Sequence, residues 1–113
     1  MITALIVLHS SIAEENPRAD TAIRLAGAML AEDKAVRLFL VGDGVTLLGT
    51  DNVGGGVPTL GLFRELLDLG LEVQCCGSSL KRHGISVLPS GVQSGSMKSL
   101  SAWISAADEL AYF

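Results

Sequence analysis

The chain has 113 residues, the size of one domain, and we expect a single domain over residues 1–113. Hydrophobic residues make up 49% of the chain and charged residues only 18%, against a usual charged share of about 25%. A monomer would therefore have little polar cover, which predicts a homo-oligomer. The net charge of −4, with 8 Lys and Arg against 12 Asp and Glu, argues against a nucleic-acid-binding surface.

The first predicted element is a strand over Thr3 to Leu8 (TALIVL), a continuous apolar run of the kind found in buried parallel strands. No apolar run approaches the ~18 residues of a membrane span, so no membrane association is expected. The start of the chain also lacks the basic region and the small-residue cleavage site of a signal peptide. Two adjacent cysteines cannot form a disulfide framework, which fits a reducing cytoplasm.

The elements that follow alternate between helices and strands. Helices are predicted where apolar residues recur at helical spacing, and strands where short apolar runs are bounded by Gly, Pro or Ser. In chain order the prediction is a helix from Asn16 (N-cap) and Pro17 (first helical residue) to about Asp33, a strand Ala35 to Val41, a helix from Pro58 to Gly70, a strand Leu71 to Cys75, a short helix Ser78 to His83 stopped by Gly84, a strand Ile85 to Leu88, a helix capped by Ser96, and a strand Glu109 to Phe113.

A glycine-rich loop from Gly42 to Val57 separates the second strand from the next helix, and only Val45 to Leu48 could hold a helical turn. Loops of this length in a small domain are usually functional or mobile. The triplet Gly54-Gly55-Gly56 is not expected to form a phosphate cradle, because neither G-x-x-x-x-G-K-[ST] nor G-x-G-x-x-G opens a helix directly after a strand.

Alternating strands and helices predict a mostly parallel five-stranded sheet covered by helices on both faces, with right-handed crossovers. The common strand order is 2-1-3-4-5, which we expect here, with a ligand site at the carboxyl ends of strands 1 and 3. His9 and Ser10 follow strand 1, and Cys76 follows strand 3. Asp43, after strand 2, would lie on the same edge.

Cys76 is the candidate nucleophile, because it lies where a strand passes into the first turn of a helix. The unpaired N–H groups and the positive end of the helix dipole favour thiolate over thiol at such a position. Lys81, Arg82 and His83 add positive charge within the next two turns. Cys75 points to the opposite face of the strand, so we expect it to be structural. The alternative is that Cys76 also only packs, as buried free cysteines often do.

Two other side chains could assist this thiol. His9 could act as a base for Cys76, and Asp43 lies on the same predicted edge. Each also has a purely structural interpretation: His9 as a loop cap, and Asp43 as a turn residue between two glycines. Lys81 and Arg82 could equally form a solvated helix face.

Four stretches, which together cover nearly the whole chain, resemble the DsrE/DsrF-like family of sulfur-trafficking proteins. Their order and spacing carry the resemblance more than any one of them alone. They are PRADTAIRLAGAML (residues 17–30), RLFLVGDGV (37–45), CGSSLKRHGI (76–85) and SMKSLSAWISAADELAYF (96–113).

The resemblance implies a flavodoxin-like three-layer α/β fold assembled as trimers or hexamers. It also implies that the cysteine after the third strand, here Cys76, accepts sulfane sulfur as a persulfide. Family members with C-G-x-C have a second cysteine where this chain has Ser79, so neither a disulfide cycle nor a dithiol metal site is expected. An arginine that often precedes the final glycine of the motif is His83 here, with Arg82 one position earlier.

The sequence therefore predicts a sulfur relay, in which the Cys76 thiolate takes sulfur from a donor protein and passes it to an acceptor thiol. The N–H groups of Ser78 and Ser79, after Gly77, would stabilise the persulfide, and this exchange needs no metal or organic cofactor. The main alternative is a non-catalytic oligomeric scaffold or small-ligand binder, in which the 42–57 loop covers the site. A hydrolase using Cys76 and His9 is a third possibility, although no orienting acid is evident.

Overall fold

The structure, a computed structural model, describes residues 1–13, 17–49 and 56–113. The predicted N-cap Asn16 and residues 50–55 of the glycine-rich loop lie outside the described residues. In chain order the elements are β1 (Thr3–Leu8), α1 (Arg18–Ala31), β2 (Ala35–Leu40), the 3-10 helix η1 (Gly42–Leu48), α2 (Gly56–Asp68), β3 (Glu72–Cys76), α3 (Gly77–Arg82), β4 (Val92–Gly95), α4 (Met97–Ala106) and β5 (Glu109–Tyr112).

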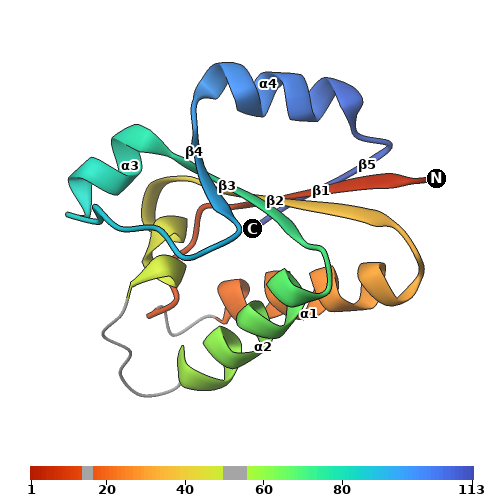
Figure 1. The fold of residues 1–113 in the computed structure, drawn as a ribbon, viewed down its shortest axis with the longest axis horizontal. Helices are drawn as coiled ribbons and strands as arrows, with labels where there is room; N and C mark the ends of the chain where they lie inside the picture. The colour runs from red at the N-terminus through yellow and green to blue at the C-terminus, as the bar shows by residue number, and fades with distance from the viewer. Residues whose placement is uncertain (14–16, 50–55) are drawn as a thin grey trace.

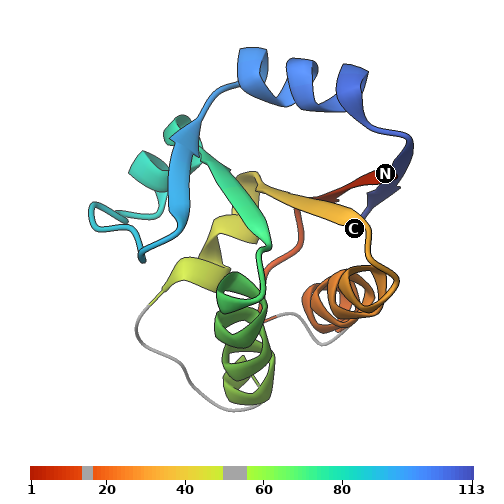
Figure 2. The same cartoon turned by 45° about the vertical axis from the view of Figure 1, so that its right-hand side comes forward.

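The five strands form one sheet in which every pairing is parallel. Helices α1 and α2 cover one face of this sheet and α4 lies across the other, so the molecule has three layers (Figures 1 and 2). The predicted α/β sandwich with a five-stranded sheet is therefore confirmed. No helix in the described ranges is long and apolar enough to cross a bilayer.

The strand order along the sheet is β4-β3-β2-β1-β5, whereas 2-1-3-4-5 was expected. From β1 to β4 each new strand pairs with the one before it, and α1 and α2 both pack on one face, as right-handed crossovers in a single direction require. The connection from β4 to β5 runs back the other way, which places α4 on the opposite face. As a result β2 lies between β1 and β3, so the strands that lead to His9 and Cys76 are not neighbours.

The predicted strand over Ile85 to Leu88 is wrong, because this segment has no regular structure and the fourth strand is Val92–Gly95. Two glycines with positive φ, Gly84 (67°) and Gly91 (90°), bound the segment and turn the chain. The N–H of Val92 donates to the carbonyl of Pro89, so the Pro-Ser-Gly turn precedes the strand instead of ending it.

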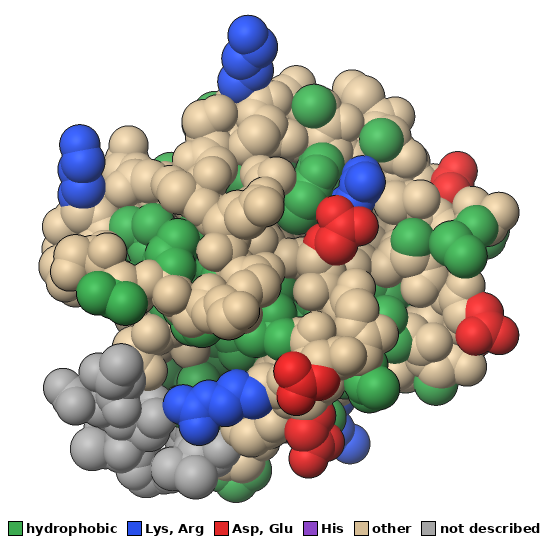
Figure 3. Space-filling model, viewed as in Figure 1, with side chains coloured by type: hydrophobic (Ala, Val, Ile, Leu, Met, Phe, Trp, Pro, Cys, Tyr) green, Lys and Arg blue, Asp and Glu red, His purple; other side chains and the backbone are tan. Residues whose placement is uncertain are grey.

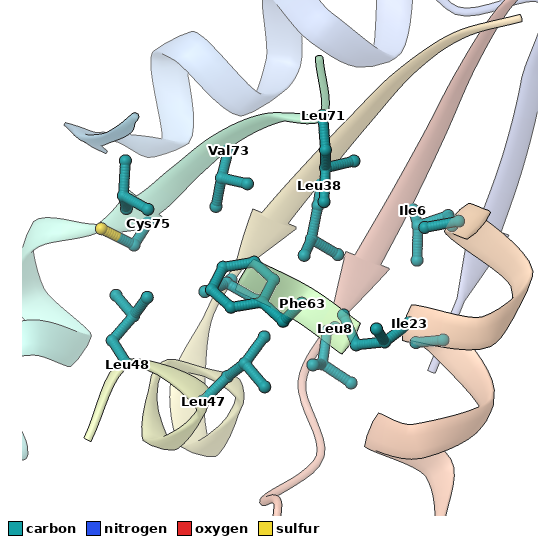
Figure 4. Packing of buried hydrophobic residues seen from close by; sticks show 14 of the residues in the cluster. Ile6, Leu8, Ile23, Leu38, Leu47, Leu48, Phe63, Leu71, Val73 and Cys75 are labelled. Atoms are coloured by element: carbon teal, nitrogen blue, oxygen red, sulfur yellow. The ribbon is translucent and has the colours of Figure 1, made fainter. Parts of the chain in front are cut away.

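Two apolar clusters lie on opposite faces of the sheet. The larger packs between the sheet and α1, α2 and η1, and Figure 4 shows its side chains meeting around Phe63 of α2. The smaller lies under α4 and consists of Leu5, Val7, Phe39 and Cys76, with four partly buried side chains packed against it: Val41, Leu100, Trp103 and Ala107. Burying each large apolar side chain contributes about 1.5–3 kcal/mol, so most of the stabilisation lies on the α1/α2 side.

Helix α4 begins as the sequence predicts, with Ser96 as its N-cap. The Ser96 hydroxyl accepts from the N–H of Ser99 (3.2 Å), and the Ser99 hydroxyl accepts from the N–H of Ser96 (2.8 Å). This reciprocal pair satisfies two N–H groups that a helix start otherwise leaves unpaired. It fixes the start of α4 directly after β4.

Candidate functional site

The two adjacent cysteines occupy opposite faces of β3. Cys75 is fully buried in the larger cluster, where Figure 4 shows it near Leu48 and Val73, and its thiol donates to the carbonyl of Gln93 at 3.3 Å. Cys76 ends β3 and is the N-cap residue of α3, with its side chain in the smaller cluster under α4. The predicted difference in direction between the two side chains is confirmed.

The two thiols also differ in their acidity. Burial and, to a smaller extent, the nearby Cys76 raise the pKa of Cys75 from 9.0 to about 11. Burial would raise the pKa of Cys76 as well, but hydrogen-bond donors and a charge outweigh it, and the pKa lies below its ordinary value of 9.0. The groups that lower the pKa of Cys76 are, in decreasing order of effect, the Ser79 hydroxyl, the backbone N–H groups of Ser79 and Ser78, and the charge of Arg82.

Ser79 is held in place by the backbone of η1. It is buried, and its hydroxyl oxygen accepts from the N–H of Gly42 at 2.8 Å. A serine hydroxyl has one hydrogen to donate, so this contact leaves that hydrogen free for the Cys76 sulfur. Cys76 makes no capping hydrogen bond through its side chain, so the donors act chiefly by favouring the thiolate once it forms.

Gly42 links this contact to His9. It has a positive φ of 57°, and a Cβ at this position would lie 2.6 Å from Nε2 of His9. Only glycine therefore lets the backbone of η1 reach Ser79 while the imidazole of His9 packs against it. The sequence did not identify Gly42 as a site residue, although a glycine directly after a strand was a visible signal.

His9 lies at the carboxyl edge of the sheet, but it is exposed and packs against Gly42. In the part of the chain that the structure describes, no hydrogen bond joins His9 to Cys76, so the base role stays a prediction. The backbone N–H groups of His9 and Ser10 both donate to the carbonyl of Phe113, at 2.7 and 3.3 Å. In the structure these two residues tie β1 to the end of the chain.

Asp43 has a partner that the sequence did not suggest. One of its carboxylate oxygens lies 3.1 Å from Nε2 of His83, which follows α3. The start of η1 therefore contacts α3 twice, through Gly42 to Ser79 and through Asp43 to His83. These two contacts position α3, and with it the donors that face Cys76.

Gly77, the first residue of α3, lies against β4. A Cβ there would be 3.4 Å from the Ser94 hydroxyl oxygen, about an ordinary van der Waals contact. The start of α3 therefore lies beside the carboxyl end of β4. Within the described ranges, no group of three or more His, Cys, Asp or Glu residues could hold a metal ion.

Comparisons with known proteins agree over the full length of the chain. The model of the DsrE/DsrF-like family matches residues 3–113. An uncharacterised protein of Methanopyrus kandleri, MK0008, is 32% identical over 115 residues, which cover 99% of this chain and 95% of that protein.

Two solved structures are similar in fold. The YchN protein from E. coli has a TM-score of 0.87 with 28% identity and full coverage of both chains. MTH1491 from Methanobacterium thermoautotrophicum has a TM-score of 0.75 with 17% identity, covering 100% of this chain and 98% of that one.

Proposed function

Because the chain belongs to the DsrE/DsrF-like family, we propose that it is a sulfur-relay protein that carries sulfane sulfur as a persulfide on Cys76. The observation that carries the proposal is the position of Cys76 as the N-cap residue of α3, where donors of Ser78 and Ser79 lower its pKa, beside a buried Cys75 whose pKa is raised to about 11. The thiolate is the reactive form in sulfur exchange, so the chain has one thiol suited to it and one that is not. A reducing cytoplasm would keep both thiols free.

The proposed exchange has two steps and needs no cofactor. The Cys76 thiolate attacks the outer sulfur of a donor persulfide, R–S–SH; the S–S bond of the donor breaks, the donor leaves as R–S⁻, and Cys76–S–SH forms. An acceptor thiolate then attacks the outer sulfur, and the Cys76 thiolate leaves. The Ser79 hydroxyl and the N–H groups of Ser78 and Ser79 would stabilise the anion at both stages.

Access to the sulfur is the step that the fold must provide. Cys76 is 8% exposed, and Leu100 and Trp103 of α4 pack against its cluster. Helix α4 has no buried residue of its own and contacts the sheet through partly buried side chains such as Leu100 and Trp103, so it is held less firmly than α1. We propose that partner docking displaces the start of α4 and exposes the thiol.

The burial of Cys76 also favours the second candidate, a non-catalytic scaffold or small-ligand binder in which this cysteine only packs. The two candidates differ in one testable property. A relay requires Cys76 to accept sulfur from a donor, and a scaffold does not.

Sulfur loading is the test of the proposed function. After incubation with a cysteine desulfurase that carries a persulfide, the native protein is expected to gain about 32 Da, and a reductant should remove the gain. Cys76→Ser should abolish the gain, whereas Cys75→Ala, which keeps an apolar side chain in the core, should retain it. Intact-mass spectrometry measures both. Equal loading of Cys76→Ser and native protein would contradict the assignment, and no loading with several donors would favour the scaffold.

We also propose that the chain is a homo-oligomer, and the exposed apolar residues of α4 and β5 support this. Leu110 (56% exposed) and Tyr112 (67%) of the edge strand β5 pair with Leu5 and Val7 of β1. Leu5 and Val7 face α4, so Leu110 and Tyr112 stand on the same face of the sheet. Met97 and Ile104 of α4 are also exposed. Apolar patches of this kind mark contact surfaces.

The double substitution Leu110→Lys with Tyr112→Lys is expected to raise the dissociation constant of the oligomer by about 100-fold, because two apolar anchors are lost. Sedimentation equilibrium measures the mass, with a trimer or hexamer expected for the native chain. Leu69→Lys, which changes an exposed leucine just after α2, is the matched control and should leave the mass unchanged. A native protein that sediments as a monomer would contradict the proposal.

A further inference from the structure

The charges of this acidic chain are divided unevenly along the sequence. Residues 73–107 contain three of the eight Lys and Arg residues and none of the twelve Asp and Glu residues. This segment therefore carries a formal charge of +3, and the rest of the chain carries −7. The segment forms nearly all of β3 and the whole of α3, β4 and α4.

The three basic residues lie on the two helices that begin beside Cys76. Cys76 pairs with Gly95 at the ends of β3 and β4, so α3 and α4 begin side by side, directly after these strands. Lys81 and Arg82 lie in the last turn of α3, and Lys98 lies in the first turn of α4. All three are exposed.

In Figure 3 the Lys and Arg side chains over α3 and over α4 have no Asp or Glu beside them, whereas those at the centre and the bottom of the view lie near Asp and Glu side chains. We call the exposed surface of Lys81, Arg82, Met97 and Lys98 the basic rim.

The basic rim is not neutralised by neighbours. Among the described residues, Lys81, Arg82 and Lys98 form no ion pair, whereas Lys34 and Arg37 each pair with a glutamate. Asp43, the acidic side chain that contacts the end of α3, pairs with His83. Met97, 53% exposed and directly before Lys98, adds an apolar contact of the kind found at the centre of interfaces.

We propose that the basic rim is the docking surface for the protein that exchanges sulfur with Cys76, and that this partner presents its sulfur on a surface rich in Asp and Glu. The inference rests on the proposed function for the thiol and goes beyond it by naming the chemistry of the partner. Complementary charge at the rim would steer an acidic partner to Cys76, while the −7 charge elsewhere would repel it.

Peptide disulfides of different charge test this inference. Three peptides carry a single cysteine as a mixed disulfide with 2-thiopyridine, flanked by glutamates, by lysines or by glutamines. The Cys76 thiolate attacks the peptide sulfur, the S–S bond breaks, and 2-thiopyridine leaves and absorbs light. At about 20 mM salt the glutamate peptide is expected to react about tenfold faster than the lysine peptide, and the ratio should approach one at about 500 mM salt.

The double variant Lys81→Gln with Lys98→Gln is expected to lose most of this preference. Arg82 is left unchanged because its charge also acts on the pKa of Cys76. Each rate is divided by the rate of the same variant with the glutamine peptide, which removes any effect on the thiol itself. Arg64→Gln removes one positive charge at an exposed position of α2, on the opposite face of the sheet from α4, and should keep the preference.

The outcomes separate the two proposals. Equal rates for the glutamate and lysine peptides would overturn the docking surface and leave sulfur relay standing. If no peptide reacts with Cys76, both proposals fail. If the double variant instead changes the mass of the oligomer, the rim is a contact between copies of this chain, and an acidic partner is excluded there.

Discussion

Iodoacetamide is expected to alkylate Cys76 near pH 7 and to leave Cys75 unmodified. Alkylation follows the thiolate fraction, and with a pKa of about 11 roughly one Cys75 in 10,000 is ionised at that pH. The thiolate fraction of Cys76 becomes appreciable at a lower pH than that of an ordinary thiol, because its pKa lies below 9.0. Replacing Cys76 by Ala should therefore reduce the alkylation rate near pH 7 by more than about 100-fold. Mass spectrometry of the labelled peptide gives the rate at each pH.

Ser79→Ala tests the cause of the lowered pKa. The Ser79 hydroxyl is the largest of the contributions that lower the pKa of Cys76, so its removal should move the midpoint of the alkylation profile to higher pH. The rate near pH 7 should fall by about tenfold or more, because one hydrogen bond to a charged group is usually worth about 1.5–3 kcal/mol.

Ser101→Ala, an exposed serine of α4, is the matched control and should keep the native profile. A midpoint for Cys76 at or above 9.0 would contradict the thiolate assignment. An unshifted profile in Ser79→Ala would assign the lowered pKa to the backbone N–H groups and the charge of Arg82.

The parts of this structure that the sequence predicted depend on local patterns. Helix α4 begins at Ser96 because a serine and the N–H three residues later pair within one turn. The two cysteines point to opposite faces because adjacent strand residues always do. Periodicity of two or of 3.6 residues is visible in any short window, which is why the alternation of elements was predictable.

The parts that the sequence missed depend on contacts between distant residues. Nothing in two apolar strands states whether β3 pairs with β1 or with β2, so the strand order could not be read. The contact of Gly42 with Ser79 joins residues 37 positions apart, and that of Asp43 with His83 joins residues 40 apart. Both depend on η1 folding back against α3. The sequence could therefore predict the helix start beside Cys76 but not the contacts that hold Ser79 and His83 in place.

Gly44→Ala is expected to lower the free energy of unfolding by about 3 kcal/mol or more, the largest effect of a single methyl group in the described chain. A Cβ at Gly44 would lie 2.0 Å from the carbonyl oxygen of Leu8, which is backbone and cannot rotate away. The same oxygen accepts from the N–H of Val41 at 3.1 Å, so a shift of η1 would also strain that bond. Urea unfolding at a fixed protein concentration measures the change.

Gly61→Ala adds the same methyl group in α2, where no atom lies within 4 Å of the new Cβ. This control should raise the free energy of unfolding by about 0.5–1 kcal/mol, because alanine favours the helix. Moving η1 off β1 would also withdraw the N–H of Gly42 from Ser79, so folded Gly44→Ala should show a Cys76 alkylation midpoint at higher pH. If the two variants unfold within about 0.5 kcal/mol of each other, η1 is not held tightly against β1. It then could not fix the Ser79 hydroxyl that lowers the pKa of Cys76.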